Sequence, residues 1–119
     1  MATTAMQLTI RFGASTPSVL EVIAPNGLRK PFSLPKKKAF VLTDITIVGP
    51  VSSIMAVVIG QGSGTTGTLR WKYLAPSLAG NVERSFTTGL VFTTPFEVIG
   101  VAPPGQDFTV LLSGFLRKA

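Results

Sequence analysis

Hydrophobic and polar residues alternate in short runs along this chain, which is the pattern of half-buried β-strands. Residues 6–12 (MQLTIRF) place four apolar side chains on one parity and three polar side chains on the other. Residues 68–74 (TLRWKYL) alternate most cleanly, so Leu69, Trp71 and Tyr73 are predicted to share one face. No window of ten or more residues keeps the 3.6-residue period of a helix, and the chain is therefore predicted to be all-β.

The longest strand-like run is KAFVLTDITIVGP, residues 38–50, which is predicted to be the central strand of the fold. Its apolar pairs, Phe-x-Leu before Thr43 and Ile-x-Ile after Asp44, lie on opposite parities. Two explanations remain open at this point. Either both faces of the strand are covered, or a bulge near Thr43–Asp44 shifts the phase of the side chains.

Glycine, proline and asparagine divide the rest of the chain into further short strands. These are predicted at 18–24, 54–60, 82–88, 89–94, 95–101 and 108–116, with Pro95 interrupting the fourth and fifth. About eight short strands at regular spacing predict one antiparallel β-sandwich domain over residues 1–119, with jelly-roll topology. Residues 28–38 contain Pro31 and Pro35, and are predicted as a basic edge segment or extended loop because proline cannot donate to a β-ladder.

Composition changes this picture by pointing to association. Charged residues make up 13% of the 119 residues, about half of the roughly 25% in an average globular chain, while 45% are hydrophobic. So few charges predict more apolar surface than a small domain hides when it is alone. We therefore expect a homo-oligomer, a trimer or larger.

Localisation signals are missing from the sequence. No apolar run reaches the roughly 18 to 20 residues of a membrane helix, so no membrane partner is expected. The N-terminus lacks a basic segment followed by a long apolar one, so no secretory signal is predicted.

The side chains that carry most enzyme chemistry are also missing. The chain has no histidine and no cysteine, which removes the commonest general base, the commonest metal ligand and the thiolate nucleophile. Two carboxylates would suffice for a glycosidase, but none of the five acidic residues lies in a motif. The glycine-rich stretch 60–67 (GQGSGTTG) lacks the Gly-Lys-Ser/Thr ending of a phosphate loop and is predicted to be a hairpin tip. We expect a non-enzymatic protein with no catalytic residues, cofactor or metal site.

Positive charge is concentrated in one short segment. Of the net charge of +6, five charges lie within residues 29–38, where no acid is present. The candidate interaction residues there are Arg29, Lys30, Lys36, Lys37 and Lys38. They are expected to dock on an acidic neighbour or to protect a sheet edge from aggregation. Non-specific nucleic-acid binding is the alternative, because clustered lysines attract phosphate.

Two aromatic residues complete the candidate set. Trp71 and Tyr73 lie two residues apart on one predicted strand. Such rings form stacking platforms in carbohydrate-binding modules, which gives a second alternative function. More often they belong to a core or to an interface.

Three stretches resemble small jelly-roll β-sandwich modules of phages and bacteria. They are the 40–47 strand with its Thr43-Asp44 pair, the Thr94-Pro95-Phe96 step, and Leu111-Leu112-Ser113-Gly114-Phe115. The resemblance covers about residues 38–116. It implies a virion decoration or accessory protein that binds itself, a capsid protein or another particle protein, at a virion surface or in a cytoplasmic assembly. No functional residue transfers from it.

Overall fold

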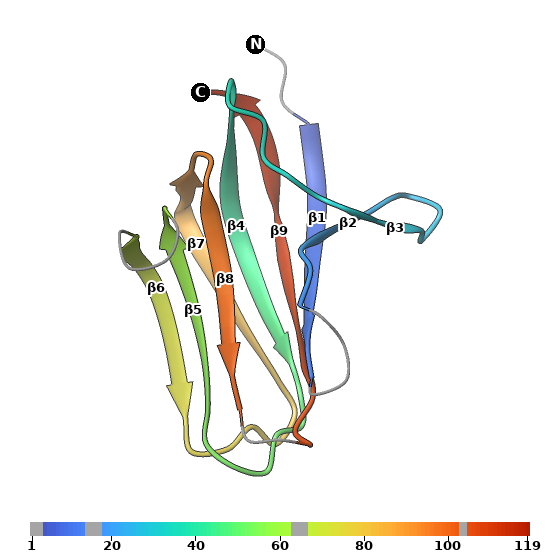
Figure 1. Ribbon diagram of the computed structural model, residues 1–119, viewed down its shortest axis with the longest axis vertical. Helices are drawn as coiled ribbons and strands as arrows, with labels where there is room; N and C mark the ends of the chain where they lie inside the picture. The colour runs from blue at the N-terminus through green and yellow to red at the C-terminus, as the bar shows by residue number, and fades with distance from the viewer. Residues whose placement is uncertain (1–3, 14–17, 63–66, 103–104) are drawn as a thin grey trace.

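The protein is all-β, with two antiparallel sheets arranged as a sandwich (Figure 1). The computed structural model describes residues 4–13, 18–62, 67–102 and 105–119. Within these residues the strands are β1 (Thr4–Phe12), β2 (Glu21–Ile23), β3 (Arg29–Pro31), β4 (Lys38–Val48), β5 (Met55–Gln61), β6 (Thr68–Ala75), β7 (Asn81–Phe92), β8 (Phe96–Val101) and β9 (Phe108–Lys118). The predicted loops at 13–17, 60–67 and 103–105 lie partly outside the described residues.

The larger sheet has the strand order β3-β2-β1-β9-β4-β7, and the smaller has the order β6-β5-β8. Figure 1 shows the smaller sheet lying against one face of the larger, with strands of both running along the long axis of the molecule. The facing sides supply one hydrophobic core. Its fully buried side chains are Phe40, Phe92, Leu8, Leu42, Ile45, Ile47, Met55, Ile59, Leu112, Val51, Val57 and Val110. Burying each Val, Leu, Ile, Phe or Met side chain contributes about 1.5–3 kcal/mol.

Strand β4 is long and buried, but it is not the centre of the sheet. It lies between β9 and the edge strand β7, whereas β9 lies between β1 and β4. Of the two explanations that the sequence leaves open, the bulge is present, because the register of β4 against both neighbours shifts between Leu42 and Asp44. This shift explains why Phe-x-Leu and Ile-x-Ile, on opposite parities, all point into one core.

Residues 82–94 were predicted as two strands, and the structure shows one. Strand β7 runs from Asn81 to Phe92 and absorbs extra residues at the β4 bulge, because Leu42 pairs with Leu90 while Asp44 pairs with Ser85. Gly89, with φ of +77°, supplies the left-handed turn that the bulge requires. The chain then passes to β8 in the other sheet.

A second bulge corrects the predicted face of Leu69. Ile59 pairs with Trp71 and Gly60 pairs with Leu69, so Arg70 is an extra residue on β6. Trp71 therefore faces the core side, and Leu69 faces outward, where 57% of its surface is exposed. A period-two pattern cannot reveal such a slip, because one inserted residue reverses the parity.

The β2–β3 hairpin lies beside β1, at the outer edge of the larger sheet. In Figure 1 it projects sideways from the sandwich. In the smaller sheet, β8 pairs with β5 on one side and forms an edge on the other.

Candidate interaction surfaces

The outer side of the smaller sheet is mainly apolar, although it is the side that faces away from the core. Cross-strand pairing arranges its side chains in three rows. Read from β6 through β5 to β8, the rows are Leu74–Ala56–Val101, Lys72–Val58–Ile99 and Leu69–Gly60–Glu97. We call these nine residues, with the adjoining Ile54, the outer face.

Large side chains of the outer face are well exposed. Ile54, Leu69, Leu74, Ile99 and Val101 have 44–60% of their surfaces in solvent. They are five of the seven exposed large hydrophobic residues in the described part of the chain. An antiparallel sheet with one wet side normally carries polar residues on that side, whereas Lys72 and Glu97 are the only polar residues among these nine positions. The sandwich therefore presents a sheet surface with the composition of an interface.

The sequence of β5 indicates that both of its faces are apolar. Residues 54–60 are apolar at every position up to Gly60. In the structure Met55, Val57 and Ile59 fill the core, while Ala56 and Val58 point outward and are half-buried. Such a run is typical of a strand that is covered on both faces. A shallow hollow beside Gly60, also bounded by Leu69 and Ile99, adds relief to the outer face.

A second surface gathers positive charge where β4 begins and β9 ends. Lys38 pairs directly with Lys118 across the two strands, and Ala39 pairs with Arg117. The backbone N–H of Ala119 donates to the carbonyl oxygen of Lys37 at 3.0 Å, which fixes the turn against the end of β9. We call Lys36, Lys37, Lys38, Arg117 and Lys118 the basic end.

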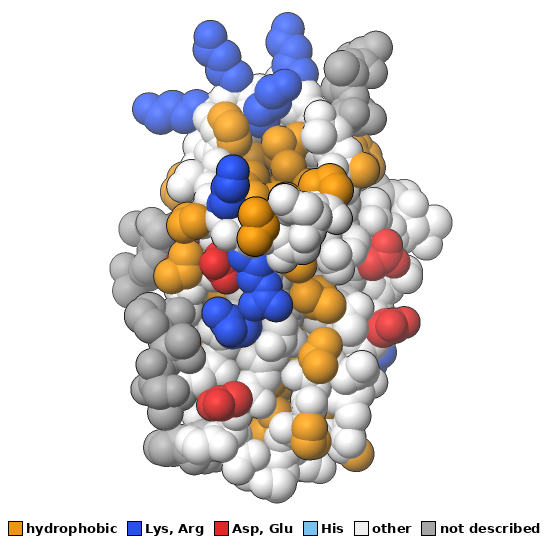
Figure 2. Space-filling view, turned by 90° about the vertical axis from the view of Figure 1, so that its right-hand side faces the viewer, with side chains coloured by type: hydrophobic (Ala, Val, Ile, Leu, Met, Phe, Trp, Pro, Cys, Tyr) orange, Lys and Arg blue, Asp and Glu red, His pale blue; other side chains and the backbone are white. Residues whose placement is uncertain are grey.

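Figure 2 shows Lys and Arg side chains gathered at one end of the molecule, the end at which Figure 1 places the C-terminus. Like charges directly opposite on neighbouring strands destabilise the pair. An acidic partner would relieve this repulsion.

The structure divides the predicted basic segment. Arg29 and Lys30 lie on β3, where Lys30 pairs with Val22, and Val22 pairs with Leu8 halfway along the larger sheet. They are therefore separate from the basic end. Nothing local in the sequence places Arg117 and Lys118 beside Lys38, because the pairing of β9 with β4 joins distant segments of the chain.

Trp71 and Tyr73 lie on β6 at the margin of the core, on the side that faces β7. Their rings stack at a centroid distance of 6.4 Å, and Phe86 meets Trp71 edge-on at 6.2 Å. The guanidinium of Arg84 lies 5.7 Å from the Tyr73 ring centroid. Both aromatic residues are half-buried, and these contacts favour packing over a carbohydrate platform.

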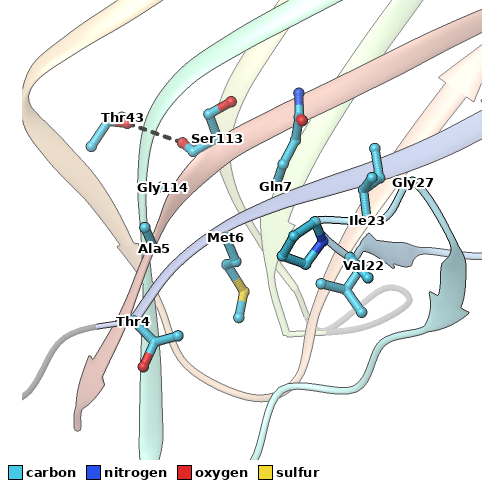
Figure 3. Close-up of a pocket in the computed structure, with 12 residues that line it drawn as sticks. Thr4, Ala5, Met6, Gln7, Val22, Ile23, Gly27, Thr43, Ser113 and Gly114 are labelled. Atoms are coloured by element: carbon cyan, nitrogen blue, oxygen red, sulfur yellow. Dashed lines mark hydrogen bonds between the residues drawn. The ribbon is translucent and has the colours of Figure 1, made fainter.

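A pocket lies beside β1 and the β2–β3 hairpin (Figure 3). Met6 and Val22 contribute apolar walls, and the Thr43 hydroxyl lies 3.1 Å from the Ser113 carbonyl oxygen, with which Asp44 competes for its one proton. The residues that line it include no charged side chain. Its polar side chains are the hydroxyls of Thr4, Thr43 and Ser113 and the amide of Gln7.

The carboxylate of Asp44 lies beside two hydroxyl groups. The Ser85 hydroxyl donates to its carboxylate at 2.7 Å, and the Thr43 hydroxyl donates at 3.0 Å. The Ser85 bond, followed by the Thr43 bond, lowers the pKa of Asp44 below its ordinary value of 3.8. Asp44 is exposed, and in the described ranges no three acidic residues gather where they could hold a metal ion.

Comparisons with protein-family models, curated proteins and solved structures gave no match. A search of the described residues for a helix long and apolar enough to span a membrane found none.

Proposed function

We propose that this chain is a non-enzymatic structural protein that self-associates or docks on a larger assembly. The observation that carries the proposal is the outer face, a nearly continuous apolar sheet surface. Removing apolar surface from water contributes roughly 25 cal/mol per Å², so covering this face with protein is favourable. Large exposed apolar patches on small domains mark interaction sites.

The strand order supports the jelly-roll part of the proposal. A jelly roll distributes its strands alternately over two sheets and brings the first strand beside the last. Here β1 lies beside β9, followed by β4 and β7, and the opposing sheet has the order β6-β5-β8. The departure is the β2–β3 hairpin, which lies beside β1 and not beside β8. With the sequence resemblance, this order favours a phage capsid decoration protein or another virion accessory protein.

The basic end fits the same role, because it can dock on an acidic surface of a capsid or other particle. It also favours a second candidate function, non-specific binding of nucleic acid. Five cations without an interspersed acid attract a phosphate backbone strongly at low salt.

Light scattering and native mass spectrometry over a range of concentrations test the proposal. We expect a trimer or larger species, or binding to an assembled particle. A monomer at every concentration that also ignores particles would contradict it. A gel shift separates the two candidates: unchanged nucleic-acid mobility at low salt removes the second, and a shift that disappears at moderate salt supports it.

A further inference from the structure

We propose that the outer face is covered by a second copy of this chain, related by a two-fold axis that runs along β5. The inference rests on the proposed self-association and names the surface that performs it. In a two-fold contact the same patch meets itself, so the patch must be complementary to its own rotated image. The three rows of the outer face meet this condition for one choice of axis.

An axis that is parallel to β5 and lies between the two facing sheets keeps each row opposite the same row of the partner. It exchanges the two outer strands, β6 and β8. Strand β6 then lies over β8 of the partner, and β5 lies over its own copy. Val58 meets the partner's Val58, and Leu74 meets the partner's Val101. Apolar side chains therefore meet apolar side chains along β5 and between Leu74 and Val101, as in aligned sheet packing at about 10 Å separation. Leu69 lies over the partner's Glu97.

The two charges of the face select this axis. Lys72 is on β6 and Glu97 is on β8, in adjacent rows. The rotation places Lys72 over the partner's Ile99, two residues along β8 from the partner's Glu97. Symmetry repeats the approach on the other side. An axis across the strands through Val58 would instead set Lys72 against the partner's Lys72, which is a like-charge contact.

Most of the net charge of +6 lies outside the outer face, although this axis brings the two basic ends to the same end of the pair, where their like charges repel. The basic end belongs to β4 and β9 of the larger sheet, whereas the outer face belongs to the smaller sheet. The axis along β5 also leaves the two basic ends side by side at one end of the pair. A further contact would extend the pair to a tetramer or larger particle.

The contact is expected to be weak in isolation. Three strands at the usual spacing and seven residues at the usual rise give a footprint of roughly 300 Å². A standard interface removes about 800 Å² of accessible surface from each partner. The pair should therefore dissociate measurably on dilution.

Mixing two charge-reversal variants tests the pairing. Lys72→Glu and Glu97→Lys each place like charges in opposition in their own homodimers, and each should weaken dimerisation on the order of tenfold. An equimolar mixture forms heterodimers in which both contacts are opposite in charge. Sedimentation velocity at low salt should show near-wild-type association, and native mass spectrometry should identify the heterodimer. Pairing within one chain would not be restored by mixing, so a mixture no more associated than its components overturns the axis.

Substitution at the centre tests the face itself. Val58→Glu puts two carboxylates against each other on the axis and should weaken association at least a hundredfold. Gln7→Glu is the control, since it adds the same charge at an exposed position on the larger sheet. Circular dichroism checks folding, and the charge-reversal mixture decides if Val58→Glu does not fold.

The outcomes separate the two proposals. If the wild type associates and Val58→Glu associates equally well, the outer face is not the contact and self-association proceeds through another surface. If the wild type never associates, the two-fold pair is overturned together with the self-association on which it rests.

Discussion

At the scale of single residues, the bulge of β4 depends on a small group of hydroxyl and carboxylate side chains. The Thr43 hydroxyl shares its one proton between Asp44 and the carbonyl oxygen of Ser113, and Ser85 reaches Asp44 from β7. These bonds join three neighbouring strands at the position where regular pairing fails. The sequence left a bulge near Thr43–Asp44 as one of two explanations, and it could not identify Ser85, which is distant in the chain.

Asp44 makes stability depend on acid pH. Its pKa in the folded state is lowered, first by Ser85 and then by Thr43, so the folded protein favours the carboxylate. The resulting stabilisation is present above the ordinary value of 3.8 and is lost as the pH falls through the lower folded value. In Asp44→Asn this contribution is absent, so the free energy of unfolding should fall less on acidification than in the wild type. Urea unfolding from about pH 6 to about pH 2 measures the difference. Parallel pH profiles of wild type and variant would contradict the assignment.

At the scale of elements, β9 and β4 approach each other closely at Gly114. A Cβ atom on this residue would collide with the carbonyl oxygen of Val41. Backbone cannot move aside as a flexible side chain can, so glycine is required for the two strands to pair with Leu42 opposite Gly114.

Gly114→Ala should therefore destabilise the protein by roughly 2–4 kcal/mol, since overpacking against fixed backbone forces the strands apart. Gly80→Ala is the matched control, because a Cβ there meets no atom within 4 Å. Its effect should stay within about 0.5 kcal/mol. Thermal or urea unfolding of the two variants makes the comparison, and similar stabilities would refute the close approach.

The elements also show how far sequence reasoning reaches. Strands with regular alternation were located well, because alternation is a local consequence of burying one face. The face of Leu69 was wrong, and β7 was divided in two, because bulges depend on pairing with distant strands. The same limit explains why the outer face was not predicted from the sequence. The apolar run of β5 was visible in the sequence, but its outward half became a surface only once the smaller sheet had a defined outer side.

At the scale of the whole molecule, charge and apolar surface are segregated. The basic end combines β4 and β9, which start 70 residues apart in the chain, whereas the outer face combines β5, β6 and β8. Two separate surfaces allow two separate contacts, one driven by apolar burial and one by charge.

Lys118→Glu should affect stability and binding in opposite directions. It converts the repulsive cross-strand pair with Lys38 into an attractive one, which should stabilise the fold by roughly 0.2–1 kcal/mol. It also lowers the charge of the basic end by two units, so the variant should elute from a heparin column at a lower salt concentration. Lys30→Glu on β3 makes the same charge change outside the basic end. Equal elution shifts for the two variants would show that the basic end does not act as one site.

The position of the basic end has a consequence for orientation. The strands run along the long axis, and the five cations of the basic end gather at one tip of it, so positive charge is distributed unevenly along the length of the molecule. Near an anionic surface such a body turns until its positive tip points inward. The long axis and the two sheets then stand perpendicular to the anionic surface, and the outer face points parallel to that surface. Neighbouring adsorbed molecules would meet through their outer faces, because adsorption restricts their diffusion to the plane of the surface.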